Sequence, residues 1–511
     1  MASINPADPA SAEVVDRRCH LSNLPEELIC MIARFSAESY SPHKKAKSYS
    51  LLCRVSQRFA ACVTGHLYQT INMNKFPFLC ARSAPFAGGP ALAKLLHTMA
   101  SAPLLCEQIQ NIDLHTPCEV STSIARDMLR KSRLVFVQSH GQSFYNELRD
   151  TISADMRQDF ISREALWAGC LALAIALAPN LRTLKLCAAW HHPALKFVLF
   201  TPNTSGNRII DRIRNIYLRC YGRRLLPAPL GCQNLESLSM QKFRIAREDC
   251  YTDCQLSTRL DKCFLAEGAM PAVFLQQLIR GSTRLRELYV IDNFWGRQDG
   301  QEPDQEAYHC ITPRQAGAIL RAHGQSLVTL RICSRGQTPR AAWPAPAQGS
   351  IGSLCALSNV RTLCIDPRLL LPRRSRNPAA LVACLPPHVE DLTLSSPTDR
   401  DYTLLLKQVG AIFPATMGST WAGGLPRLNC IRLCPDTRNK FVTLRTLCDT
   451  DEQKGQELEA VGIKARNAGW VCLSCKGGSI YDLVFFKGCG PHKIRQFLNE
   501  YPTLEPLDLS R

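Results

Sequence analysis

The sequence has few aromatic residues and no apolar run long enough to cross a bilayer. Phe, Trp and Tyr make up 7% of its 511 residues, and its most apolar run, Leu166 to Ala178, spans only thirteen. A membrane-spanning helix needs about twenty. The first eighteen residues also lack the apolar stretch of a secretory signal peptide. We therefore expect a cytoplasmic or nuclear protein with no membrane partner.

Sequence motifs of common enzyme classes are also missing. The chain has no P-loop, no Gly-rich dinucleotide fingerprint and no G-x-S-x-G nucleophile elbow. Catalytic Cys–His pairs come together only in the folded chain, and nothing in the sequence singles one out. We expect a protein that is not an enzyme and uses no cofactor.

Charge is unbalanced, because acidic residues are fewer than basic ones. The chain has 61 Lys and Arg against 43 Asp and Glu, a formal net charge of +18. Such a charge raises the question of nucleic-acid binding. The basic residues are scattered, however, and no RNA-binding or helix-turn-helix fingerprint accompanies them. This distribution favours a solvated basic surface. The densest basic groups are Lys44-Lys45-x-Lys47, Arg223-Arg224 and Arg373-Arg374-x-Arg376.

Cysteine, by contrast, is abundant. The 25 cysteines are an odd number and follow no repeating framework. In an intracellular protein we expect reduced thiols that act mostly as small core residues. One group near the C-terminus has the spacing of a tetrahedral zinc site, although a predicted strand between its two pairs favours core and capping roles instead. The four candidate ligands are Cys472, Cys475, Cys489 and His492.

Residues 21–73 carry the pattern of a small helical module. Leu24-Pro25-Glu26-Glu27 predicts a helix start, since proline suits the first helical position and acidic residues suit the first turn. A basic interval, Ser36–Ser48, then interrupts the apolar periodicity, and Leu67–Ile71 predicts a short extended segment. Two apolar faces at helical spacing flank the interval. They consist of Leu28, Ile32 and Phe35, and of Leu52, Val55, Phe59 and Val63.

These residues carry a family resemblance. The pattern Leu24-Pro25-x-Glu27-Leu28, then Ile32 and Phe35, then Leu52-x-x-Val55-Ser56-x-Arg58-Phe59, resembles the F-box family, especially fungal F-box proteins with leucine-rich-like repeats. The closing Leu67-Tyr68-x-Thr70-Ile71 fits that type, whereas the long basic interval with Lys44–Lys47 departs from it. The resemblance implies docking on a Skp-type adaptor and, through it, on a cullin–RING ubiquitin ligase. The implied adaptor-binding residues, an incompletely buried apolar patch, are Leu24, Pro25, Leu28, Ile32, Val55 and Phe59.

A hexamer template, apolar-x-x-apolar-x-apolar, recurs through the rest of the chain. It is typical of the strand of a leucine-rich repeat: the last two apolar positions point inward, and the first turns the chain into the core. Predicted helices precede several copies, at Arg163–Ala178, at Pro271–Arg280, after Thr312 and at Pro491–Glu500. This order predicts parallel strands with helices outside. Copies begin at Ile109, Leu181, Ile213, Leu235, Leu285, Leu327, Val360, Val389 and Leu428, and more weakly at Ile480 and Leu504.

The copies are unevenly spaced, 22 to 72 residues apart, whereas regular repeats run about 20–29 residues. We therefore predict an α/β fold in which residues 1–20 are disordered, 21–73 form the F-box-like module and 88–511 form an irregular leucine-rich-repeat-like solenoid. An α/β domain without a solenoid is the alternative. The expected insertions are His115–Ile161, Phe243–Ala269, Gly296–Ile311 and Ser334–Ser350.

The predicted function follows from the resemblance and the repeats. We expect the substrate-recognition adaptor of a Skp/cullin/F-box-type ubiquitin ligase, whose repeats bind a client protein that the sequence does not identify. A repeat scaffold with no ligase role is the first alternative, because terminal repeats also need capping. A basic nucleic-acid-associated repeat protein is the second, and its binding would collapse as salt rises.

Overall fold

The structure is a computed structural model of the whole chain, and it confirms a mixed α/β fold with a mostly parallel sheet. No helix in the part that it describes is long and apolar enough to cross a membrane. The described residues are 24–38, 42–72, 89–114, 122–157, 163–187, 192–203, 206–220, 232–245, 259–291, 311–333, 349–370, 380–395, 402–413, 425–434, 452–475, 483–487 and 504–506.

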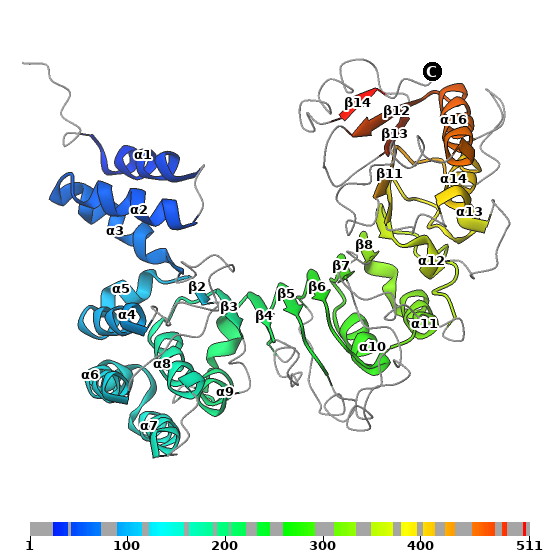
Figure 1. Cartoon of the computed structure of the whole chain (residues 1–511). Coiled ribbons are helices and arrows are strands. Elements are labelled where there is room, and N and C mark those ends of the chain that lie inside the picture. Colours follow the sequence, from blue (N-terminus) through cyan, green and yellow to red (C-terminus); the bar gives the residue numbers. More distant parts are fainter. Residues whose placement is uncertain are drawn as a thin grey trace, which may run out of the picture.

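In the described part of the chain, fourteen strands form one sheet in the order β1 to β11, then β13, β12 and β14. Strands β1 to β11 pair in parallel, each with its neighbour in the chain. The sheet bends into an arch with helices along its outer side (Figure 1). The strands are β1 Thr70–Asn72, β2 Asn111–Leu114, β3 Thr183–Cys187, β4 Asn215–Arg219, β5 Ser237–Gln241, β6 Lys262–Ala266, β7 Glu287–Ile291, β8 Thr329–Cys333, β9 Thr362–Ile365, β10 Asp391–Ser395, β11 Cys430–Cys434, β12 Trp470–Cys475, β13 Leu483–Lys487 and β14 Leu504–Pro506.

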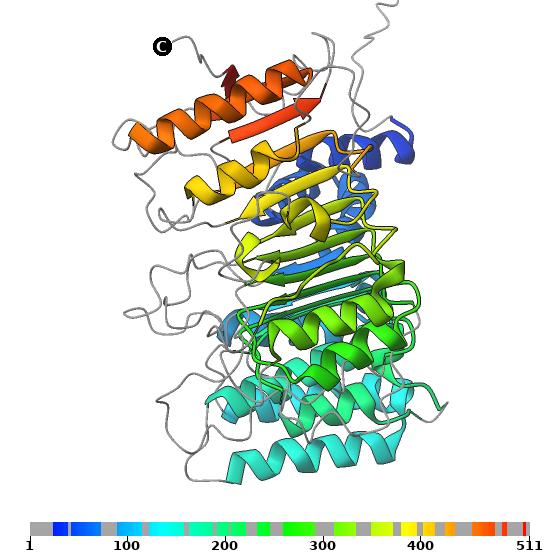
Figure 2. The ribbon, with the colours of Figure 1, turned by 90° about the vertical axis from the view of Figure 1, so that its right-hand side faces the viewer.

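Helices connect most of the strands. Seen from the side, the strands lie one above another, roughly parallel, and the neighbouring helices run beside them (Figure 2). The helices are α1 Glu26–Glu38, α2 Pro42–Cys53, α3 Gln57–Gln69, α4 Gly89–Ser101, α5 Pro103–Gln108, α6 Thr122–His140, α7 Gln142–Arg157, α8 Arg163–Leu177, α9 Pro193–Phe200, α10 Ala272–Gly281, α11 Pro313–His323, α12 Pro367–Leu370, α13 Ala380–Cys384, α14 Tyr402–Gly410 and α16 Glu452–Asn467.

The hexamer template explains the core. In β3 the two strand positions, Leu184 and Leu186, are buried, and Leu181 is buried just before the strand. The same pattern holds in β7 for Leu288 and Val290. We call each strand, together with the segment that leads into it, a unit. Because alternate residues of a strand point to opposite faces, the buried apolar residues of each unit form one row that faces the helices. These rows join a single large apolar core, so the strand prediction is confirmed for these copies.

A repeated hydrogen-bond pattern links neighbouring units. The carbonyl of Gln110 accepts from the N–H groups of Arg182 and Thr183 at 2.8 and 3.0 Å, and equivalent carbonyls do so on to β11. Three asparagine amides at equivalent positions each donate, at 2.7 Å, to a carbonyl of an earlier unit; they are Asn180, Asn234 and Asn359. Each directly precedes a template copy, a signal that the sequence prediction missed.

One strand lies where the sequence predicted an insertion. Residues Phe243–Ala269 contain β6, whose unit follows the template with Leu260, Cys263 and Leu265 buried. The copy was missed because a cysteine occupies the middle position. Burial raises the pKa of the Cys263 thiol, so this cysteine packs as a neutral core residue.

The prediction of parallel strands is wrong at the C-terminal end. Strand β13 pairs antiparallel with both β11 and β12, and β14 pairs antiparallel with β12. Strand β13 lies between β11 and β12 in the sheet, although it follows β12 in the sequence. The chain therefore reverses direction between β12 and β13, and these two strands form an antiparallel pair. The described chain does not include the helix expected before Leu504, nor most of Gly296–Ile311 and Ser334–Ser350.

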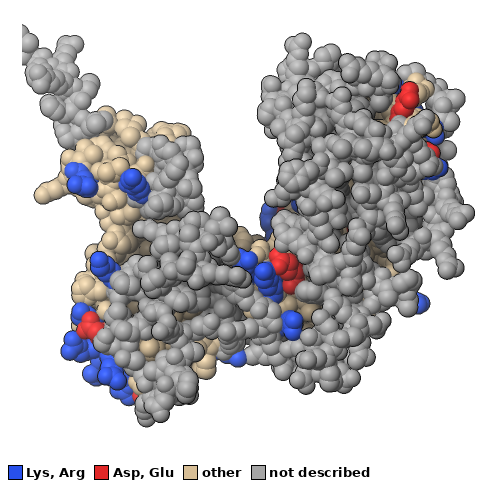
Figure 3. Space-filling view, in the orientation of Figure 1, with Lys and Arg blue, Asp and Glu red and all other residues tan. Residues whose placement is uncertain are grey.

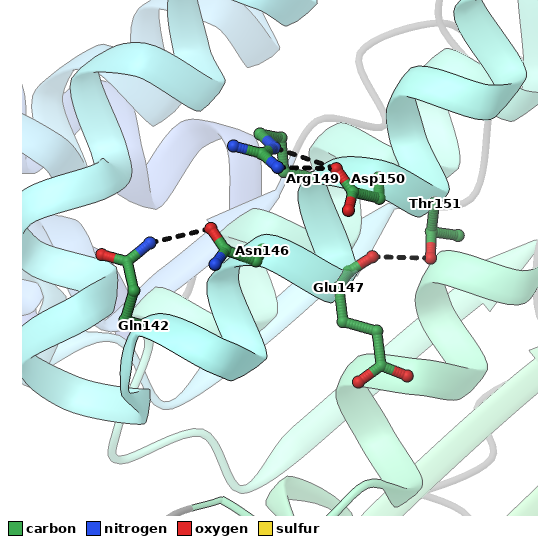
Figure 4. A network of polar contacts seen from close by, with 6 residues as sticks. All are labelled: Gln142, Asn146, Glu147, Arg149, Asp150 and Thr151. Carbon is green, nitrogen blue, oxygen red and sulfur yellow. Dashed lines mark hydrogen bonds and ion pairs between the residues drawn. The ribbon is translucent and has the colours of Figure 1, made fainter.

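The predicted insertion His115–Ile161 is occupied by α6 and α7. The exposed face of α7 is stabilised by local hydrogen bonds (Figure 4): Gln142 donates to the Asn146 side chain, and the Thr151 hydroxyl donates to the Glu147 carbonyl, each at 2.8 Å. Contacts four residues apart are the normal neighbours on a helix surface. The insertion therefore adds a helical layer to the core.

A buried histidine lies at the corner between α6 and α7. The His140 ring packs against Phe136 and Phe144, with centroids 4.9 and 5.4 Å away. Its Nε2 lies 2.8 Å from the carbonyl oxygen of Ala176, so Nε2 carries the proton of the neutral ring. Burial, together with the positive charge of Arg212, lowers the pKa of His140.

We expect acid to loosen this corner. Because the folded-state pKa of His140 lies below its ordinary 6.5, the neutral ring contributes its full stability above pH 6.5, and that contribution is lost as pH falls below 6.5. Hydrogen exchange in residues 122–157, corrected for intrinsic rates, should accelerate between about pH 7.5 and about pH 5.5. The variant His140→Gln keeps a donor for Ala176 but does not titrate, so it should lose this acceleration. Equal acceleration in both proteins would refute the assignment.

Candidate functional site

The N-terminal helical module, defined as α1 to α3, has a small core of its own. Ile29 and Ala33 of α1 pack with Phe59 and Val63 of α3, and this cluster is separate from the main core. The side chain of Ser56 caps α3 by accepting a hydrogen bond from the Phe59 N–H at 3.2 Å. Four buried side chains are too few to cover the apolar surface of three helices.

The apolar surface left uncovered lies mainly on α1. Four side chains at spacings of three and four, which we call the α1 stripe, are exposed by 38 to 67%. Six of the nine exposed large apolar side chains of the described residues belong to this module, so the exposure is concentrated there. Figure 3 shows few charged side chains on its described surface. The α1 stripe consists of Leu28, Met31, Ile32 and Phe35; Leu51 and Val55 are the other two.

The structure separates the predicted adaptor-binding residues into two groups. Pro25, Leu28, Ile32 and Val55 are exposed, whereas Leu24 is half-buried against the small core. The prediction that Phe59 belongs to an incompletely buried patch is wrong, since its side chain is 2% exposed. Helix α3 turns Phe59 onto Ile29 and Ala33. Met31 and Leu51 are exposed but were not predicted to be, because the apolar periodicity of the sequence did not indicate which face of each helix points outward.

The predicted basic interval is partly helical. Helix α2 begins at Pro42 and contains Lys44–Lys47, so the interval Ser36–Ser48 does not simply separate two helices. Proline is accommodated at the start of α2 because the first N–H groups of a helix have no intrahelical partner. The module consequently has three helices, and α2 packs against both others.

Strand β1 fixes the module to the sheet. Thr70 and Ile71 pair with Asn111 and Ile112 of β2. The Asn111 amide also donates to the Thr70 hydroxyl at 3.1 Å, and Ile71 packs against the main core. Helix α1 lies at the opposite end of the module from this attachment (Figure 1). The α1 stripe is therefore held away from the sheet.

The second candidate surface is the inner strand face, the face of the sheet turned away from the helices. Parallel pairing places one residue of each strand in a row across it. The row is mixed, with acidic, basic, hydroxyl and aromatic side chains. Asp113, Ser239, Cys364 and Thr393 are buried, whereas the other six members are partly exposed and available to a protein partner. Its members are Asp113, Lys185, Tyr217, Ser239, Phe264, Tyr289, Arg331, Cys364, Thr393 and Arg432.

Charges on this face are largely paired. Lys185 Nζ lies 3.3 Å from Asp113 Oδ2 and 5.1 Å from the centre of the Tyr217 ring. Lys262 Nζ lies 2.6 Å from Glu287 Oε1, and this hydrogen bond raises the pKa of Lys262. Blue and red side chains adjoin at the base of the arch (Figure 3). Paired charges of both signs suit contacts with a protein better than with a phosphate backbone.

The candidate zinc ligands are only partly placed. Cys472 is buried in the main core, and burial raises the pKa of its thiol to about 12. A zinc ligand has to be a thiolate, so this environment favours the core role. The side chains of Cys475, Cys489 and His492 lie outside the described residues. Among the side chains that are described, no cluster of three metal-binding residues occurs.

Neither the protein-family models nor the curated proteins contain a match to this chain. Its function therefore has to be inferred from the two surfaces that the fold creates, the α1 stripe and the inner strand face.

Proposed function

We propose that this chain is the substrate-recognition subunit of a Skp/cullin/F-box-type ubiquitin ligase. The N-terminal helical module is an F-box that binds a Skp-type adaptor, and the arch is a leucine-rich-repeat-like solenoid that holds a client protein. Ubiquitin transfer takes place on other subunits, which the complex brings close to the client. The chain acts by positioning, so it needs no active site of its own.

The α1 stripe is the observation that carries this proposal. Soluble proteins seldom leave a contiguous apolar surface uncovered unless a partner binds it. Leu28, Met31, Ile32 and Phe35 have the i, i+3, i+4, i+7 spacing with which an amphipathic helix fits a hydrophobic groove. The stripe begins within the Leu24-Pro25-x-Glu27-Leu28 pattern on which the F-box resemblance rests.

The repeating units support the solenoid half of the proposal. From β2 to β11, the template residues are buried in the main core, and a backbone carbonyl before each strand accepts hydrogen bonds from N–H groups before the next strand. Arrays of this kind depend on nearest-neighbour contacts and offer long concave surfaces to partners. The inner strand face of β2 to β11 supplies such a surface, with mixed polar and aromatic side chains.

A scaffold without a ligase role is the second candidate, and one observation favours it. Strand β1 extends the sheet by pairing with β2, which is what a capping element would do. A cap, however, needs its apolar residues for its own packing. The exposure of the α1 stripe is unexplained by capping alone, and for this reason we place the ligase subunit first.

Direct binding tests the proposal. The full chain is co-expressed with a Skp-type adaptor, and the mixture is separated by size-exclusion chromatography with mass measured by light scattering. We expect a stable one-to-one complex that withstands dilution to submicromolar concentration. If the two proteins elute separately while the chain remains folded, the ligase proposal fails and the scaffold remains.

A further inference from the structure

Two cysteines on different helices lie next to each other inside the N-terminal helical module. The Cys30 thiol of α1 donates a hydrogen bond to the carbonyl oxygen of Cys62 on α3, with Sγ and O 3.8 Å apart. The neighbouring Cys30 thiol also contributes to raising the pKa of Cys62. Both residues are half-buried, so small reagents can reach the pair.

The small core next to the two cysteines holds their helices in place. Cys30 follows the buried Ile29, and Cys62 precedes the buried Val63, so the contact between the Cys30 thiol and the Cys62 carbonyl lies directly beside the small core. Partial burial is the main cause that raises the pKa of Cys62, and Glu26 adds to it. The Cys62 thiol is therefore protonated at neutral pH, and only its small thiolate fraction can attack a disulfide.

We propose that Cys30 and Cys62 form a reversible dithiol–disulfide site, oxidised by a low-molecular-weight disulfide of the glutathione class, which fastens α1 to α3. One protein thiolate attacks the S–S bond of the oxidant, forms a mixed disulfide and releases one small thiol. The second protein thiolate then attacks the protein sulfur of the mixed disulfide and releases the second small thiol. Two protein thiols lose two electrons, the oxidant gains them, and the two protons end on the released thiols.

The disulfide is expected to stabilise the packing of α1 against α3, and this effect does not depend on the proposed function. A Cys30–Cys62 bond closes a loop between residues 32 positions apart. The bond restricts the unfolded state of a module whose small core has four buried side chains among the described residues. Local opening of α1 becomes rarer when α1 is fastened to α3. Hydrogen exchange in residues 24–38 is expected to slow by about tenfold or more on oxidation and to recover on reduction.

The test uses the full chain incubated with oxidised glutathione under native conditions. Remaining thiols are alkylated, and the digest is analysed by mass spectrometry for a peptide that links Cys30 to Cys62. Hydrogen exchange of α1 is measured on the same sample. The variant Cys30→Ser should lose both the link and the slower exchange. The variant Cys355→Ser should keep both; it alters a second pair, Cys355 and Cys384, which interact electrostatically.

The outcomes are separable. Glutathione adducts on Cys30 or Cys62 without the linked peptide would overturn the proposal, as would a linked peptide that leaves the exchange of α1 unchanged. Circular dichroism of Cys30→Ser establishes that the variant is folded. If serine disturbs the module, Cys30→Ala, which leaves no polar group at the position, replaces it in the comparison.

Discussion

Replacing Phe35 by aspartate is expected to weaken binding of a Skp-type adaptor by at least about thirtyfold, which corresponds to an interface hot spot of about 2 kcal/mol. Phe35 is the most exposed member of the α1 stripe, at 67%. A charge at this position has to be desolvated when the stripe enters an apolar groove, whereas in the free chain it stays in water. The affinity of the purified full chain for the adaptor can be measured by isothermal titration calorimetry.

Two further variants control this experiment. Leu134 of α6 is 69% exposed but lies outside the module, so Leu134→Asp should bind the adaptor like the native chain. Phe59 is buried in the small core, and Phe59→Ala should unfold the module, because emptying an aromatic core position costs about 3–5 kcal/mol. Hydrogen exchange of residues 24–72 distinguishes the two effects. Native affinity in Phe35→Asp would refute docking through the α1 stripe.

A single methyl group at Gly317 is expected to destabilise the middle of the arch by about 3 kcal/mol or more. A Cβ built on Gly317 in α11 would overlap the backbone carbonyl of Ile351. That same carbonyl accepts a hydrogen bond from Arg321 Nη1 at 2.7 Å. Backbone atoms cannot rotate away as a side chain can, so α11 and the segment around Ile351 must separate. Hydrogen exchange in residues 311–333 and 349–370 should reveal the loss.

Gly65→Ala is the matched control for this variant. Gly65 also lies in a helix, α3, but the nearest atom to its added Cβ is the side-chain oxygen of Gln108 at 3.2 Å. The flexible end of Gln108 can move, and alanine favours a helix over glycine by about 1 kcal/mol. We expect Gly65→Ala to be neutral or slightly stabilising. Equal stability of Gly317→Ala and the native chain would show that the close approach is not maintained in solution.

Local sequence patterns were sufficient where a structure depends on neighbours along the chain. The helix after Thr312 begins as predicted. The Thr312 hydroxyl accepts a hydrogen bond from the Gln315 N–H at 3.2 Å, and the Gln315 side chain accepts one from the Thr312 N–H, which completes a capping box. The template located most parallel strands because a strand with one buried face alternates apolar residues with a period of two. The template did not identify the β6 copy, because Cys263 occupies one of its apolar positions.

Which apolar face of α1 points inward could not be predicted from α1 alone. Ile29 and Ala33 form one apolar row, and Leu28, Ile32 and Phe35 form another, and both have helical spacing. Packing of α3 against α1 decides that the first row is buried and the second exposed. The same packing buries Phe59, which the sequence placed in the partner-binding patch.

The sequence by itself determined the α/β class, the run of parallel strands and the start of the N-terminal helical module, because each depends on residues a few positions apart. Only the tertiary structure decided the antiparallel pairing of β12 to β14, the outward side of α1 and the meeting of Cys30 with Cys62. These features join segments separated along the chain. Their geometry follows from how whole helices and strands pack, a choice that no local periodicity specifies.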